Sequence, residues 1–209
     1  MSEIPTNALK QASPDHPIHD FIARRWSPYA FADRAVASAD LRALFEAARW
    51  AASSYNEQPW SYIVATKADA AFYERVLSCL VDANQAWAKA APVLGLGCTS
   101  LKFALNGKPN AAAVHDLGQA SASLTFEATS RGLYVHQMIG ILPDKARVAF
   151  RIPEGVEAVT ALAIGYRADP SALPEAIGAR DLAPRQRKPL VKFVFGEEWG
   201  QASESLTSS

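Results

Sequence analysis

The pattern of apolar and polar positions along the chain alternates between helical spacing and short continuous apolar runs. Apolar residues in the segment 41–52 recur every three or four positions, which predicts a helix with Ser38 as its N-cap. The segments 72–80 and 144–150 predict shorter helices of the same kind. A polar break at Asn84-Gln85 is expected to separate the first of these from a short helical turn.

Three apolar runs predict strands rather than helices. They cover residues 61–66, 93–98 and 157–166, and the last of them is the strongest candidate for a central strand. Pro59 stands just before the first run and prevents the preceding helix from continuing into it. Because strands and helices are interspersed along the chain, the pattern favours an α/β or α+β fold.

The segment 111–131 predicts one long helix rich in alanine and serine, and Gly132 is well placed as the residue that ends it. Its predicted inward side is mostly small or aliphatic, which suits either burial inside one domain or a seam between two helices of a dimer. That side consists of Val114, Leu117, Ser121, Leu124 and Ala128.

The chain is expected to form one domain over residues 18–199. Residues 1–17 are predicted to be a polar, proline-rich arm, and residues 200–209 a polar tail. The segment 168–189 contains four prolines and is predicted to be a long loop, a feature that is often functional in a compact domain.

The composition restricts the class of protein. Lys+Arg and Asp+Glu number 21 each, so the formal net charge is zero, which argues against a dedicated nucleic-acid binder or a binder of anionic membranes. The two cysteines, Cys79 and Cys98, cannot by themselves form a disulfide framework or a zinc site. The first twenty residues lack the apolar segment of a secretory signal, and no apolar run approaches the length of a membrane span. We therefore expect a cytoplasmic protein without a metal site.

Three polar segments carry the candidate chemistry. The segment 24–31 places two guanidinium groups and a hydroxyl among aromatic residues, which suits a phosphate beside a flat ring, although a solvated arginine pair is the simpler reading. The segment 53–60 presents hydroxyls and amides between a helix and a strand, and could equally be an ordinary turn. The segment 184–189 is a basic cluster in an otherwise neutral chain, or else a solvated loop.

These segments, in this order, resemble the FMN-dependent nitroreductase family over about residues 18–199. The shared motifs are R-x-S-x-x-x-F from Arg25, the block S-S-x-N-x-Q-P-W from Ser53, the strand ending A-I-G-Y, and R-x-R-K-P-L from Arg185. The resemblance implies an α+β fold with a mostly antiparallel sheet flanked by helices. It also implies an intertwined homodimer with FMN at the subunit interface.

The resemblance assigns the FMN phosphate and ribityl chain to two basic segments. Arg25 and Ser27 are implied ligands, with backbone contacts from Trp26, and Arg185 and Arg187 are implied as the second half of a phosphate clamp.

For the flavin ring, the resemblance implies contacts from three further places. Serines and an amide from the partner subunit are expected to reach the ring, another amide to contact its pyrimidine edge, and backbone N–H groups to approach its N5 and O4 atoms. The residues implied are, in that order, Ser53, Ser54 and Asn56; Asn84; and Met138, Ile139 and Gly140.

Two positions depart from the family pattern. Tyr29 stands beside the expected flavin site where many members have Lys or Arg, and the missing positive charge is expected to alter the flavin potential. The segment 136–140 departs from the usual aromatic and Gly-Gly pattern.

The resemblance implies an oxidoreductase that uses NADH or NADPH to reduce FMN and then reduces nitroaromatic or quinone acceptors by a ping-pong reaction. The flavin supplies the redox chemistry, so no catalytic side chain is assigned. Three alternatives remain: another flavin reaction on the same fold, such as dehalogenation or flavin fragmentation; a flavin-binding protein without turnover; and a phosphate-binding module without flavin. The segment 191–195 is expected to extend across the dimer, with Trp199 as an anchor.

Overall fold

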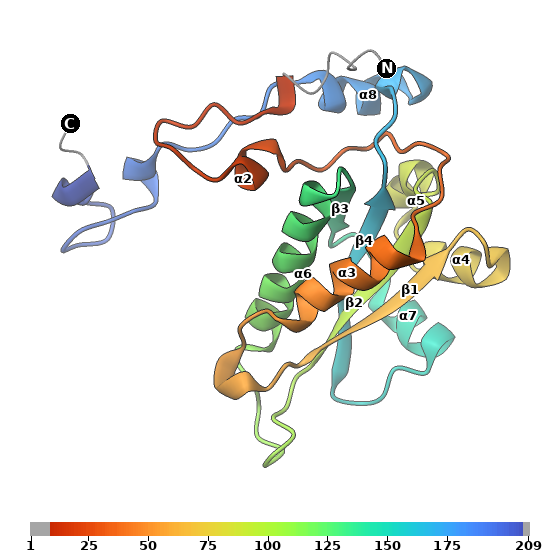
Figure 1. The fold of residues 1–209 in the computed structure, drawn as a ribbon. Coiled ribbons are helices and arrows are strands. Elements are labelled where there is room, and N and C mark those ends of the chain that lie inside the picture. Colours follow the sequence, from red (N-terminus) through yellow and green to blue (C-terminus); the bar gives the residue numbers. More distant parts are fainter. Residues whose placement is uncertain (1–8, 207–209) are drawn as a thin grey trace.

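A four-stranded antiparallel sheet forms the centre of the computed structural model (Figure 1). Its strands lie in the order β1 (Trp60–Thr66), β2 (Val93–Ser100), β4 (Val156–Gly165) and β3 (Tyr134–Met138), and every neighbouring pair is antiparallel. The predicted strand 157–166 is confirmed as β4, an inner strand whose last six residues are all buried. An antiparallel sheet with helices confirms the predicted α+β class.

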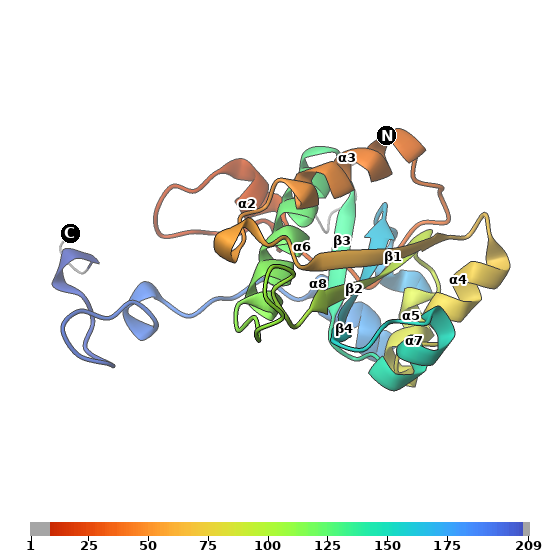
Figure 2. The same cartoon turned by 90° about the horizontal axis from the view of Figure 1, so that it is seen from below.

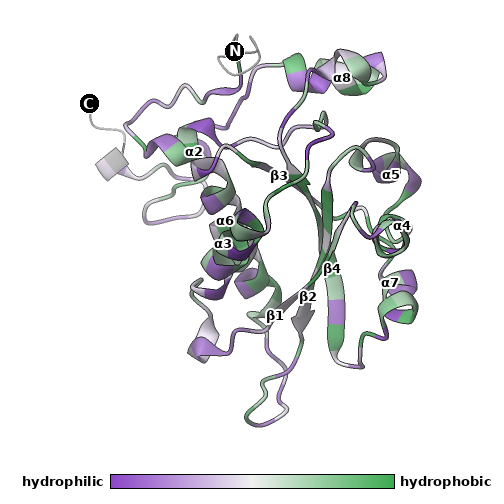
Figure 3. Ribbon diagram, turned by 45° about the vertical axis from the view of Figure 1, so that its right-hand side comes forward, coloured by the Kyte–Doolittle hydropathy of each residue, from purple (hydrophilic) through white to green (hydrophobic). Residues whose placement is uncertain are grey.

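Helices cover both faces of the sheet (Figures 2 and 3). One face carries α3 (Ser38–Arg49) and α6 (Ala113–Ser130), and the other carries α4 (Ala70–Leu77), α5 (Asp82–Ala88) and α7 (Pro143–Phe150). The buried apolar side chains form two groups, one on each side of the sheet. The sheet is therefore the middle of three layers, as expected when both of its faces are apolar.

The structure describes residues 9–206. Residues 1–8 of the predicted arm 1–17, and residues 207–209 of the predicted tail, lie outside the described residues. The remaining elements are short: α2 (Asp20–Arg24), α8 (Glu175–Leu182) and the 3₁₀ helices η1 (Ser54–Asn56), η2 (Pro170–Ala172), η3 (Leu190–Lys192) and η4 (Glu204–Leu206).

The long helix α6 agrees with the prediction except in its first turn. Gly132 follows its C-cap with a φ of 72°, a left-handed conformation that glycine adopts without strain. Four of the five residues predicted to face inward are buried, but Val114 is 52% exposed. Ala113 precedes Leu117 by four residues and continues the buried side, whereas Val114 lies about 100° around the helix from Ala113.

Ser38 is not the N-cap that its position suggested. It is the first residue of α3, and the N-cap is Ala37, which makes no side-chain capping bond. The predicted loop 168–189 is also partly wrong, because it contains α8 and η2.

The predicted break at Asn84-Gln85 is wrong, because both residues lie inside α5. Their side-chain amides donate hydrogen bonds to the carbonyl oxygens of Gly140 (3.0 Å) and Leu80 (2.7 Å). From the local sequence these two polar side chains favour an interruption of the helix, because they can compete for backbone hydrogen bonds. In the structure, partners outside the helix satisfy them instead.

The C-terminal segment leaves the body of the fold after α8. The ribbon from about residue 184 onward runs past α2 and ends away from the sheet (Figures 1 and 2). It exposes large apolar side chains to solvent: Phe193 is 56% exposed and Trp199 is 93% exposed.

Candidate functional site

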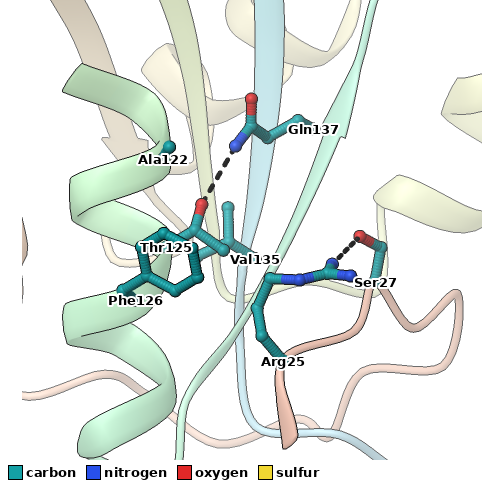
Figure 4. Close-up of a pocket in the computed structure, with 7 residues that line it drawn as sticks. All are labelled: Arg25, Ser27, Ala122, Thr125, Phe126, Val135 and Gln137. Atoms are coloured by element: carbon teal, nitrogen blue, oxygen red, sulfur yellow. Dashed lines mark hydrogen bonds between the residues drawn. The ribbon is translucent and has the colours of Figure 1, made fainter. Parts of the chain in front are cut away.

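A pocket of about 340 Å³ lies between the segment after α2, helix α6 and strand β3 (Figure 4). Arg25 and Ser27 reach it from the segment after α2, and the Arg25 guanidinium donates a 3.3 Å hydrogen bond to Ser27 Oγ. On the opposite side Gln137 Nε2 donates to Thr125 Oγ1 at 3.0 Å, which links β3 to α6. The other lining residues are Ala122, Phe126 and Val135.

Arg185 and Arg187 come from the far end of the chain to the same place. Burial lowers the pKa of Arg185, and the charges of Arg25 and Arg187 lower it further. Burial and the charge of Arg187 likewise lower the pKa of Arg25. Among the described residues no carboxylate counters either shift, so the three guanidinium groups form a cluster of mutually repelling positive charge. The structure thus brings together the two predicted halves of the clamp, and their repulsion would be relieved by a bound dianion such as a phosphate.

Trp26 supports the clamp by packing rather than by its polar atom. Its side chain is buried, its ring meets that of Tyr134 edge-on at 5.7 Å, and the Lys10 ammonium lies 5.1 Å from its centre. The Arg185 guanidinium donates to the carbonyl oxygens of Ala23 (2.7 Å) and Lys10 (3.1 Å), which fixes it beside the segment that carries Arg25.

Tyr29 lies in an aromatic cluster between β3 and α5. Its ring meets those of Trp87 and His136 edge-on, at 4.9 and 4.6 Å between centres. Its hydroxyl accepts a 3.2 Å hydrogen bond from the Arg180 guanidinium. A positive charge therefore adjoins the Tyr29 hydroxyl, although Tyr29 itself is uncharged.

Asn84 and the end of β3 form a second group of predicted site residues. Asn84 Nδ2 and the backbone N–H of Val81 both donate to the carbonyl oxygen of Gly140, at 3.0 and 3.1 Å. A Cβ added to Gly140 would lie 2.5 Å from Asn84 Nδ2, so only glycine allows this approach. Met138 is buried, whereas the Ile139 side chain is 86% exposed.

The segment 53–56 lies apart from the clamp within one chain. The backbone N–H of Ser54 donates to the Asp116 carboxylate in the first turn of α6 at 3.0 Å, whereas the pocket borders the same helix from Ala122 to Phe126. Six to ten residues of helix separate Asp116 from the pocket, about 9 to 15 Å along the helix axis. Figure 1 shows residues 54–56 and α2 near opposite ends of α6.

The backbone of this segment is strained. Tyr55, Asn56 and Gln58 have φ values of 53°, 55° and 52°, in the left-handed region that side chains disfavour. The Ser53 hydroxyl accepts from the N–H of Gln58 at 3.0 Å and closes the turn. Such strain is typical of functional segments that their surroundings hold in place.

Two buried carboxylates were missed by the reasoning from sequence. Asp116, in the predicted long helix, is 1% exposed and accepts a hydrogen bond from the N–H of Ser54. Asp181, placed in a predicted loop, is 2% exposed and accepts hydrogen bonds from the N–H groups of Tyr29 and Ala30. No local pattern marks either residue, because each has its partner more than 60 residues away.

Comparison with known proteins bears on the family and the fold. The sequence profile of the Nitroreductase family matches residues 22–166, well over half of the chain. This chain belongs to the nitroreductase family. The nitroreductase-like fold expected from the sequence is thereby confirmed.

Solved structures show the same fold. One, described as an oxidoreductase containing FMN, is 31% identical, with a TM-score of 0.85 over 95% of this chain and 98% of that one. A variant of an FMN- and NADPH-dependent nitroreductase from Sphigopyxis sp. strain HMH is 21% identical, with a TM-score of 0.63 over 86% of this chain and 98% of that one. At that identity the second likeness shows the fold alone.

A curated relative from Mycolicibacterium smegmatis, an uncharacterised 15.4 kDa protein, is 35% identical over 127 residues, which are 59% of this chain and 82% of the relative. Across residues 9–206 of this nitroreductase-family chain, no helix combines the length and apolar character that a membrane span requires.

Proposed function

We propose that this protein is an FMN-dependent oxidoreductase that takes reducing equivalents from NADH or NADPH and passes them to nitroaromatic or quinone acceptors. The observation that carries the proposal is that Arg185 is hydrogen-bonded to the segment preceding Arg25, which lines the pocket with Ser27, and that the charge of Arg187 acts on both arginines. The solved relative described as containing FMN supports the choice of this cofactor. The fold relative described as NADPH-dependent supports the choice of reductant.

In this proposal the three arginines and Ser27 hold the phosphate. A hydrogen bond between charged groups contributes about 1.5–3 kcal/mol, so a pair of such bonds accounts for much of a tight cofactor affinity. Arg185 is already fixed by two backbone carbonyls, whereas the described hydrogen bond of Arg187 goes only to the carbonyl of its neighbour Gln186. Arg187 is therefore the arginine most free to turn towards an anion.

The remaining residues orient the ring and shape its surroundings. Asn84 and the 138–140 backbone adjoin each other and offer amide groups to the heterocycle edge, as the family resemblance implies. FMN, when bound, supplies the capacity to accept and donate hydride. The chain supplies position and electrostatics, and we assign no catalytic side chain.

The site is completed, in this proposal, by a second copy of the chain. Ser53, Ser54 and Asn56 lie too far along α6 to reach the clamp of their own subunit. The extended C-terminal segment carries exposed Phe193 and Trp199, and large exposed apolar side chains mark interaction surfaces. A homodimer would cover these side chains and bring the serines of one subunit to the FMN of the other.

The visible absorption spectrum of the purified protein, with added FMN and then with NADPH or NADH under anaerobic conditions, tests the proposal. We expect bound-flavin bands that bleach on addition of the nicotinamide and return when a quinone or nitroaromatic is added. Bands that never bleach would contradict the oxidoreductase and favour a flavin-binding protein without turnover. A protein that binds no FMN would contradict every assignment at the site.

A further inference from the structure

We propose that Asp181 is a positioning residue for the phosphate clamp, because its buried carboxylate ties the two halves of the clamp together. This inference rests on the proposed FMN function. Asp181 is not among the residues that line the pocket, and it contacts the backbone next to the clamp. It would therefore act through Arg185 and Arg187 and not by touching the cofactor.

The Asp181 carboxylate binds directly to the backbone beside the clamp. Both oxygens of the Asp181 carboxylate accept from the N–H of Tyr29 at 3.0 Å, and Oδ2 also accepts from the N–H of Ala30 at 3.0 Å. The side chain is 2% exposed, and such backbone bonds offset the cost of burying its charge. The contact joins positions 152 residues apart.

The hydrogen bonds between Asp181 and Tyr29 lie close to the clamp along both segments. Tyr29 follows Ser27 by two residues, and Arg185 and Arg187 follow Asp181 by four and six. Because a residue spans at most about 3.6 Å, fixing Asp181 to Tyr29 restricts how far the two basic segments can separate.

Asp181 also lies near a buried cation, Lys10. Lys10 is 7% exposed, and its ammonium donates to the carbonyl oxygen of Arg180 at 2.6 Å. Burial lowers the pKa of Lys10, the charge of Arg185 lowers it further, and the charge of Asp181 opposes both effects. Asp181 thus favours the charged form of Lys10, whereas the repulsion among Arg25, Arg185 and Arg187 is not countered by any described carboxylate. Without the hydrogen bonds of Asp181 to the backbone, that repulsion would favour separation of the two segments.

Comparing the affinities for FMN and riboflavin tests the inference, because riboflavin lacks only the phosphate. We expect Asp181→Ala to weaken FMN binding about tenfold or more, by loss of charge-assisted contacts, and to change riboflavin binding less than about twofold. The FMN-to-riboflavin affinity ratio should then fall in the same direction as in Arg187→Ala. In the double variant the ratio should fall by less than the product of the two single effects, since both changes disable one clamp.

A matched control is Asp169→Ala. Asp169 also accepts a backbone hydrogen bond, from Ser171 at 2.9 Å, but it is exposed and caps η2. The Asp169→Ala substitution should leave the FMN-to-riboflavin affinity ratio unchanged.

Lys10→Met is the second variant if Asp181→Ala fails to fold. It keeps the aliphatic stem near Trp26 and removes the ammonium. We expect it to lower the ratio, because Lys10 would no longer hold the carbonyl of Arg180, next to Asp181.

The outcomes separate the two proposals. If the unmodified protein binds no FMN, the proposed function fails and this inference fails with it. If the unmodified protein prefers FMN but Asp181→Ala or Lys10→Met retains the full preference, only the inference is wrong. An equal loss of affinity for FMN and for riboflavin would also overturn the inference, because it would show that Asp181 has a general structural role.

Discussion

His136 is a buried titratable side chain whose environment favours its neutral form. Its Nδ1–H donates to the carbonyl oxygen of Pro28 at 2.9 Å, and its ring contacts those of Tyr29 and Trp87. Burial lowers the pKa of His136, while the Pro28 carbonyl and the charge of Asp181 act in the opposite direction with smaller effect. Protonation of this one residue would therefore disturb the packing beside the clamp segment.

The stability of the protein should consequently fall as the pH decreases below about 6.5, where an unfolded histidine takes up a proton that folded His136 resists. The free energy of unfolding should fall by at most about 1.4 kcal/mol per pH unit through this residue. Urea unfolding between pH 7.5 and 5 measures the slope. His136→Asn keeps a donor for Pro28 and should flatten it, whereas His16→Asn, at an exposed position, should not. Equal slopes in all three proteins would contradict the assignment.

At the scale of elements, the junction of β3 with α5 depends on one close approach. The Gly140 carbonyl accepts from both Val81 and Asn84, so the turn after β3 is fixed to the start of α5. This contact is also what holds Asn84 in a helix instead of in the predicted break. Local polarity and tertiary hydrogen bonding favour opposite structures here, and the tertiary contact decides.

Gly140→Ala should therefore destabilise the protein by about 1–2 kcal/mol, because the new Cβ displaces the Asn84 amide and breaks its hydrogen bond. Gly95→Ala is the control, since a Cβ there meets its neighbours at 3.5 Å or more, an ordinary contact. Urea unfolding measures both. In an Asn84→Ala background the cost of Gly140→Ala should shrink. A cost that is independent of Asn84 would show that another contact is responsible.

The whole molecule has a layered body and a C-terminal segment that leaves it (Figure 1). A single chain does not explain why Phe193 and Trp199 remain exposed, nor why the strained 53–58 turn lies far from the pocket. Both features are explained if two copies form a homodimer in which each subunit completes the site of the other.

Truncation after Lys188 keeps Arg185 and Arg187 but removes the exposed aromatic residues. We expect the dimer to weaken or dissociate, as measured by light scattering, and the FMN affinity to fall with it. Truncation after Leu206 is the control, because it retains the whole described segment, and it should leave the mass in solution unchanged. A full dimer after truncation at Lys188 would contradict the proposed role of the segment.

The sequence alone determined the structural features that depend on residues close together in the chain. The strand β4, the long helix α6 and the glycine that ends it could be predicted, because each follows from spacing or backbone preference within a few positions. The clamp arginines could be proposed because they stand in short motifs.

Only the tertiary structure decided which of these segments meet. Asp181 ties two segments 152 residues apart, Asn84 bonds to Gly140 across 56 residues, and Asp116 holds Ser54 across 62. The buried carboxylates look like surface residues in the sequence, because burial of a charge becomes favourable only when distant backbone donors are brought to it. Local patterns carry no record of those distant donors, so the site could be assembled only from the fold.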